Sequence, residues 1–93
     1  MIACRDGRCA VEGPVTMSNV TATLAEGNTL FSAPHTVVDL GAITEVDSSA
    51  VSLLLEWRRA ARAANRTVEF VNLPANLRSL AELYGVAALL DNK

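Results

Sequence analysis

The chain is 93 residues long, 51% of its residues are hydrophobic and 19% are charged, and its formal net charge is −2. Such a length accommodates one domain and is too short for two independent cores, and the composition is that of a folded rather than a disordered chain. The slight acidic excess argues against nucleic acid as the main ligand, because phosphate backbones are bound by an excess of Lys and Arg. We therefore expect a single domain over residues 1–93.

The N-terminal residues bear on the compartment and on the redox state of the chain. No apolar run approaches the ~20 residues that cross a bilayer, and the first residues lack the basic and apolar stretches of a signal peptide, so we expect a cytoplasmic protein without direct membrane insertion. Cys4 and Cys9 surround a turn dipeptide and can face each other across two strands. We expect them to stay reduced, as small hydrophobic side chains. No metal site is expected, because the only histidine, His35, is far away in sequence.

The first predicted element is a β-hairpin. Residues 2–5 and 9–12 are short strand-like segments around Asp6-Gly7, a dipeptide favoured in tight hairpin turns. Gly13-Pro14 is expected to end the second strand, because proline cannot donate to a sheet ladder.

A helix and a strand are predicted next. The helix covers residues 16–26, ends at Gly27 and is followed by a loop over residues 28–34. Its apolar positions at helical spacing are Met17, Val20 and Leu24. Residues 36–40 are β-branched and largely apolar, which is typical of a strand buried on both faces. Residues 43–46 are then expected to form a connection.

The clearest helical pattern covers residues 50–64. The preceding Asp47-Ser48-Ser49 supplies side chains that cap helix N-termini. Arginines crowd the last turns, where positive charge complements the helix dipole, and Asn65 is expected to cap the C-terminal end. The apolar stripe of this helix contains Val51, Leu54, Leu55 and Ala61, broadened by Leu53, Trp57, Ala60 and Ala64.

The last third of the chain predicts a strand over residues 67–71 and a helix that begins near Pro74 and ends at Gly85. On that helix Tyr84 is expected to pack against the core. Residues 86–90 are expected to form a short helix or a packing strand. Strands and helices thus alternate in the second half, which favours parallel strands joined by crossover helices.

The segment over residues 37–51 reads VVDLGAITEVDSSAV. An apolar strand ending in Asp39-Leu40 is followed by Asp47-Ser48-Ser49 at a helix start, and this arrangement resembles the central strand–loop–helix of STAS domains. The order of the predicted elements is similar to that fold over nearly the whole chain. The resemblance implies an α/β fold with a mixed sheet of about four to five strands and three to four helices packed largely on one face.

STAS domains are used in several ways, and the resemblance leaves two of them open. Ala50 stands where anti-sigma-factor antagonists usually have glycine, and the following Leu-Leu-Leu-Glu-Trp with paired arginines looks more like the MlaB type. The MlaB type implies a non-enzymatic accessory subunit, without cofactor, that binds the cytoplasmic ATPase of a phospholipid-transport ABC complex maintaining outer-membrane lipid asymmetry. The protein would then lie on the inner face of the inner membrane through its partner. The alternative is an anti-sigma-factor antagonist that binds a serine kinase.

The start of the 50–64 helix is where both readings place the site. The resemblance implies that the important hydroxyl of the MlaB type is Ser48, whereas the residue phosphorylated in antagonists matches Ser49. Phosphate there would gain from exposed N–H groups but would repel an acidic partner. The residues expected to bind the partner are Asp47, Ser48, Ser49, Val51 and Ser52.

Other conspicuous residues have two readings each. Trp57 is either core or an interface anchor, and the basic cluster of Arg58, Arg59, Arg62 and Arg66 is either a solvated helix face or a docking patch. No serine has a base and a supporting acid in its sequence context, and no phosphate-binding glycine loop is present, so no enzymatic activity is expected. A small-ligand sensor domain is a third hypothesis, for which the sequence offers no specific pocket.

Overall fold

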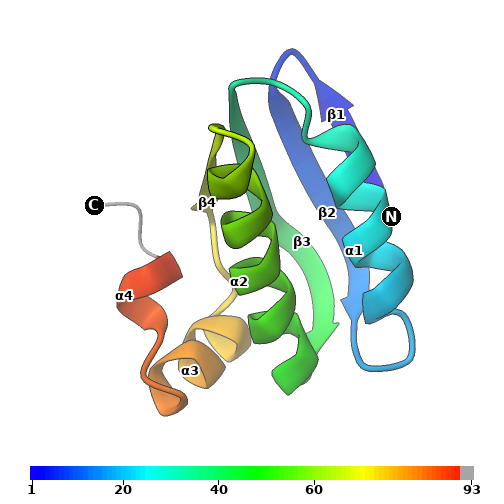
Figure 1. Cartoon of the computed structure of the whole chain (residues 1–93). Coiled ribbons are helices and arrows are strands. Elements are labelled where there is room, and N and C mark those ends of the chain that lie inside the picture. The colour runs from blue at the N-terminus through cyan, green and yellow to red at the C-terminus, as the bar shows by residue number, and fades with distance from the viewer. Residues whose placement is uncertain (91–93) are drawn as a thin grey trace.

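The computed structural model describes residues 1–90, and its centre is a four-stranded mixed sheet in the order β1-β2-β3-β4 (Figure 1). β1 pairs antiparallel with β2, whereas β2 with β3 and β3 with β4 are parallel. The prediction of a mixed sheet is therefore confirmed. The strands are β1 (Ile2–Arg5), β2 (Arg8–Val15), β3 (His35–Val46) and β4 (Thr67–Val71).

The helices gather on one side of this sheet, with α1 and α2 side by side in front of it and α3 and α4 next to β4 (Figure 1). Helical packing on one face agrees with the prediction from the sequence, and α2 corresponds to the predicted 50–64 helix. Within residues 1–90, no helix is long and apolar enough to cross a membrane. The helices are α1 (Val20–Leu30), α2 (Ser48–Ala63), α3 (Ala75–Leu83) and α4 (Ala87–Leu90).

β2 and β3 are both longer than their sequences predict. The expectation that Gly13-Pro14 ends the second strand is wrong, and so is the expectation of a connection over residues 43–46. Gly13 pairs with Ile43, and Val15 pairs with Val46, with a shift of register between these two pairs. Because the ladder is irregular at this point, a residue without an N–H is tolerated inside the strand.

α1 begins four residues later than predicted and continues through Gly27, so residues 28–30 are helical rather than loop. The residues before it form a turn that the Asn19 side chain holds. Its Oδ1 accepts the Thr16 N–H at 3.0 Å, and its Nδ2 donates to the Pro14 carbonyl at 2.9 Å. Met17 lies in this turn with 73% of its surface exposed, so it does not belong to the core face of a helix.

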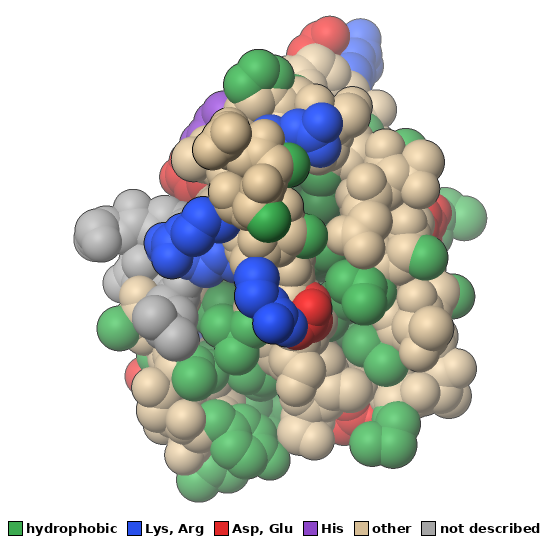
Figure 2. Space-filling model, viewed as in Figure 1, with side chains coloured by type: hydrophobic (Ala, Val, Ile, Leu, Met, Phe, Trp, Pro, Cys, Tyr) green, Lys and Arg blue, Asp and Glu red, His purple; other side chains and the backbone are tan. Residues whose placement is uncertain are grey.

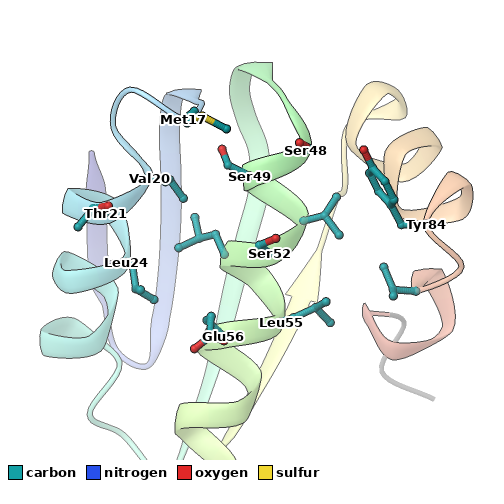
Figure 3. Close-up of a pocket in the computed structure, with 13 residues that line it drawn as sticks. Met17, Val20, Thr21, Leu24, Ser48, Ser49, Ser52, Leu55, Glu56 and Tyr84 are labelled. Carbon is teal, nitrogen blue, oxygen red and sulfur yellow. The ribbon is translucent and has the colours of Figure 1, made fainter.

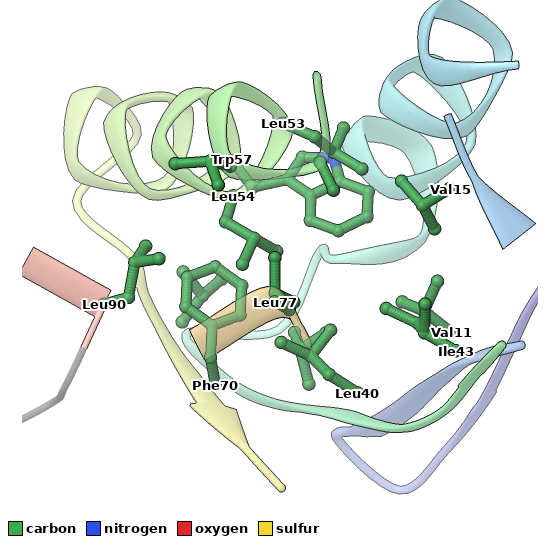
Figure 4. Packing of buried hydrophobic residues seen from close by; sticks show 14 of the residues in the cluster. Val11, Val15, Leu40, Ile43, Leu53, Leu54, Trp57, Phe70, Leu77 and Leu90 are labelled. Carbon is green, nitrogen blue, oxygen red and sulfur yellow. The ribbon is translucent and has the colours of Figure 1, made fainter. Parts of the chain in front are cut away.

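Trp57 is a core residue, only 2% exposed, which settles the two readings left open by the sequence. Its ring packs edge-on against Phe31, with ring centroids 4.8 Å apart. Its Nε1 donates a hydrogen bond to the carbonyl of Leu24 at 3.2 Å. Gly27 of α1 lies directly against the indole, where a β-carbon would overlap the ring. α2 is thereby fixed against α1 and the sheet (Figure 4).

The hairpin forms as predicted, but its cysteines are not reduced. Asp6 and Gly7 both have positive φ angles, as a tight turn requires. This turn sets Cys4 opposite Cys9 in the β1–β2 register, and the two form a disulfide. The expectation of free thiols is wrong, because the strand register brings the two sulfurs within bonding distance.

Candidate functional site

Asp47 organises the start of α2. One carboxylate oxygen accepts the backbone N–H of Ser49 at 2.9 Å and also a hydrogen bond from the Ser49 hydroxyl. The other oxygen accepts the backbone N–H of Met17 at 2.8 Å. Asp47 therefore caps α2, as predicted, and also joins it to the turn between β2 and α1.

These hydrogen bonds lower the pKa of the Asp47 carboxyl, with the Ser49 hydroxyl as the largest contribution and the Met17 N–H next. Each donor stabilises the ionised form, because a carboxylate accepts hydrogen bonds that the protonated group accepts less well. The helix start is therefore an anchored, ionised group beside two serine hydroxyls.

The two serines after Asp47 differ in accessibility. Ser48 is exposed, whereas Ser49 is half-buried with its hydroxyl directed to Asp47. Within residues 1–90, the Ser48 hydroxyl has no hydrogen-bond partner. Ser52 is also exposed, one turn further along α2. Ser48 and Ser52 are thus the hydroxyls that α2 offers to a partner (Figure 3).

A groove with a volume of about 580 Å³ surrounds this part of α2. Met17 lies on its α1 side and Tyr84 on its α3–α4 side, with the serines between them (Figure 3). The expectation that Tyr84 packs into the core is wrong, since 55% of its surface is exposed. The groove is lined by Met17, Val20, Thr21, Leu24, Ser48, Ser49, Val51, Ser52, Leu53, Leu55, Glu56, Tyr84 and Val86.

The groove is mainly apolar at its edges and polar at its centre. Met17, Tyr84 and the neighbouring Leu83, which is 75% exposed, are large hydrophobic side chains that the fold leaves open to solvent. Hydrophobic side chains also appear on both sides of the lower end of the molecule in the space-filling view (Figure 2). Exposed apolar residues around a polar centre are typical of protein interaction surfaces.

Four of the five residues predicted for the site line the groove: Ser48, Ser49, Ser52 and Val51, the last of which is only 4% exposed. The fifth, Asp47, is not part of the lining and acts through its hydrogen bonds to Ser49 and Met17. Sequence reasoning missed Met17 and Tyr84 as site residues. Both have helical spacing to apolar neighbours, so their sequence pattern is that of core residues, and only the tertiary structure distinguishes them.

His35 and Asp39 are titratable residues that lie away from these serines. His35 lies at the opposite end of β3, with its Nε2 3.4 Å from Glu69. Asp39 accepts hydrogen bonds from the Gly41 N–H at 2.8 Å, from Arg8 and from Asn72, and the first of these contributes most to its lowered pKa. Among residues 1–90, no three His, Cys, Asp or Glu side chains lie where they could hold a metal ion.

Solved structures with the same fold include two forms of one protein. The anti-sigma factor antagonist SpoIIAA in its unphosphorylated form is 17% identical, with a TM-score of 0.74, over 95% of this chain and 82% of the other. The Bacillus cell fate determinant SpoIIAA in the phosphorylated form is 15% identical, with a TM-score of 0.66, over 95% of this chain and 85% of the other.

A third structure, described as Mglu, is 18% identical with a TM-score of 0.62, over 83% of this chain and 20% of the other. No curated protein matches the sequence. At these identities the structural matches define the fold alone, a single α/β domain with a mixed sheet. The sequence model of the family described as "Mlab, STAS domain" matches residues 4–91, and the chain belongs to that family.

Proposed function

We propose that this protein is a non-enzymatic accessory STAS subunit that docks on the cytoplasmic ATPase of a phospholipid-transport ABC complex. Membership of the Mlab STAS family supports this reading. In this role the protein lies in the cytoplasm, held at the inner face of the inner membrane by its partner. It stabilises the ATPase and supports assembly of a complex that maintains outer-membrane lipid asymmetry.

The observation that carries the proposal is the exposed Ser48 hydroxyl at the centre of an apolar-edged groove. A helix N-terminus presents backbone N–H groups and partial positive charge, so a hydroxyl there is well placed to accept or donate a hydrogen bond at an interface. Tyr84 is an aromatic side chain of the kind enriched at binding hot spots. Because Asp47 holds both α2 and the Met17 turn, the surface is ordered before the partner arrives, which reduces the entropic cost of binding.

Copurification from native membranes tests the identity of the partner. Tagged wild-type protein should recover an ABC ATPase together with its permease, identified by mass spectrometry. Ser48→Arg, which places a long charged side chain in the groove, should lose both. Ser32→Arg is the matched control, because Ser32 is exposed and follows α1 at the end away from Met17. Recovery of the same partners by all three proteins would contradict docking at the start of α2.

An anti-sigma-factor antagonist is the second candidate. It is favoured by the position of Ser49, whose hydroxyl lies in the first turn of α2 beside Asp47. A phosphate on Ser49 would replace the hydrogen bond to Asp47 by repulsion between two anions, and this would alter the surface that a partner contacts. The test is phosphate incorporation from ATP with a cognate serine kinase. Incorporation that is lost in Ser49→Ala and kept in Ser48→Ala would establish this function in place of the first.

A further inference from the structure

A second pocket lies at the other end of α2, with a volume of about 480 Å³. At a rise of 1.5 Å per residue, Ser48 and Arg62 are separated by about 21 Å of helix, so this pocket is distinct from the docking groove. Basic side chains gather over this part of α2 in the space-filling view (Figure 2). The pocket is lined by His35, Arg58, Arg62, Arg66, Thr67, Val68 and Glu69.

Three arginines, from α2 and from the connection that follows it, bring positive charge to this pocket. Arg58 and Arg62 are four residues apart on α2 and therefore lie on one face of the helix. Arg66 comes from the connection between α2 and β4. In the described part of the chain, the only acidic residue in the lining is Glu69, whose Oε1 lies 3.4 Å from the Nε2 of His35. Within residues 1–90, the lining therefore combines three arginines with one acidic residue, in a chain whose net charge is −2.

The C-terminal end of α2 does not need these arginines to satisfy its carbonyl groups. The N–H of Ala64 donates to the carbonyls of the last turn. The N–H of Asn65 also donates to the Arg62 carbonyl at 3.1 Å, and that of Arg66 to the Ala61 carbonyl at 2.8 Å. Backbone N–H groups already cap the helix, so hydrogen bonding to its last carbonyl groups does not account for the convergence of the side chains.

Arg62 and Arg66 differ from Arg59 and Arg8 in their ion pairs. Arg59, on the same helix, pairs with Glu56, and Arg8 pairs with Asp39 at 3.0 Å. Within residues 1–90, neither Arg62 nor Arg66 forms an ion pair. Close by, the Thr67 hydroxyl lies 2.6 Å from the Nδ1 of His35, which brings two further polar side chains to the pocket wall.

We propose that this pocket binds a phosphate group, with Arg62 and Arg66 as its principal ligands. Guanidinium groups offer several N–H donors in a fixed plane, which matches the oxygen atoms of phosphate and gives strong, charge-assisted hydrogen bonds. The phosphate belongs either to a small phosphate monoester in solution or to the headgroup of an anionic phospholipid. Both sources present the same chemistry to the pocket.

Titration of the full chain with inorganic phosphate tests the site. Amide chemical shifts monitor the titration, at constant ionic strength and with chloride as the reference anion. Saturable shifts at His35 and Thr67 are expected. Arg62→Gln and Arg66→Gln should each weaken binding about tenfold or more, as for the loss of a charged hydrogen bond. Arg59→Gln is the matched control, since it removes the same charge from the same helix outside the pocket and should leave binding unchanged. Equal weakening by Arg59→Gln would overturn the proposal.

Vesicle flotation then distinguishes the two sources. Phosphatidylcholine vesicles with and without phosphatidic acid are the probes. Flotation that requires phosphatidic acid and is lost in the Arg62→Gln, Arg66→Gln double variant supports the site and assigns the phosphate to a lipid headgroup. Saturable binding of inorganic phosphate without flotation supports the site and assigns it to a soluble monoester. Failure of both overturns it.

Discussion

The Asp47 carboxylate accepts the backbone N–H of Met17 at 2.8 Å, across 30 positions of sequence. The same side chain caps α2 through Ser49. Two segments of the docking groove therefore share one anchor, and the Met17 backbone keeps a fixed position relative to the serines. A substitution of Asp47 should therefore disturb both the Met17 turn and the start of α2.

Asp47→Asn should reduce the dependence of stability on acid pH. The pKa of Asp47 is lowered in the folded chain, so its stabilisation is fully present above the unfolded pKa of 3.8 and is lost as the pH falls through the lower folded value. Urea unfolding of the wild type between about pH 5 and pH 2 should show a steeper loss of free energy than Asp47→Asn, with Asp39 contributing the remainder in both.

Asp6→Asn provides the control for this comparison. It removes the same charge from the hairpin turn, where asparagine tolerates the positive φ angle. The acid dependence of this variant should stay steeper than that of Asp47→Asn. An equal slope for wild type and Asp47→Asn would show that the anchor does not stabilise the folded chain.

Ser49→Asp and Ser48→Asp should affect stability differently although they add the same charge. A carboxylate at position 49 replaces the hydroxyl that donates to Asp47 and faces its negative charge, so the free energy of unfolding should fall. A carboxylate at the exposed position 48 gains from the helix dipole and should be tolerated. Thermal melts at low ionic strength make the comparison. Equal melting temperatures for the two variants would contradict the assigned hydrogen bond between Ser49 and Asp47.

Gly27→Ala should destabilise the fold by about 1–3 kcal/mol, the usual cost of overpacking a core, because the added methyl group overlaps the Trp57 ring. Chemical unfolding gives the value. In a Trp57→Leu background the same substitution should be neutral or stabilising by up to about 1 kcal/mol, since alanine favours a helix more than glycine does. A stabilising effect of Gly27→Ala in the wild type would contradict the packing of α1 on α2.

The Cys4–Cys9 disulfide should contribute about 2 kcal/mol, as expected for a bond that closes a short loop in the unfolded chain. Unfolding of the wild type with and without reductant measures this contribution. Cys4→Ser is the control, because it leaves the buried Cys9 in place and its stability should not respond to reductant. If reductant has no effect on the wild type, the cysteines are not bonded in solution.

Much of the fold could be predicted from the sequence where local chemistry and tertiary structure agree. The strand over residues 67–71 and the capped helix after Asp47 are examples, because hydrophobic pattern, caps and turn residues point to the same answer. Gly27 is the opposite case. Its low helix propensity indicates a stop, but the Trp57 indole requires a residue without a side chain at this place inside α1.

The candidate site could be predicted only in part for a similar reason. Asp47 and the two following serines carry a local capping signal, and the structure keeps them together. Met17 and Tyr84 come from other elements and reach the groove through the turn held by Asn19 and through the end of α3. Their exposure depends on where those elements begin and end, which helical spacing alone does not determine.

The most direct test of docking at the start of α2 is the affinity of the purified ABC ATPase subunit for wild type, Ser48→Arg and Ser32→Arg. The account predicts a saturable complex for wild type and Ser32→Arg. It predicts a loss of at least about 2 kcal/mol, the threshold for a hot spot, for Ser48→Arg with its thermal stability retained. An unchanged affinity of Ser48→Arg, or no complex with the wild type, would contradict it.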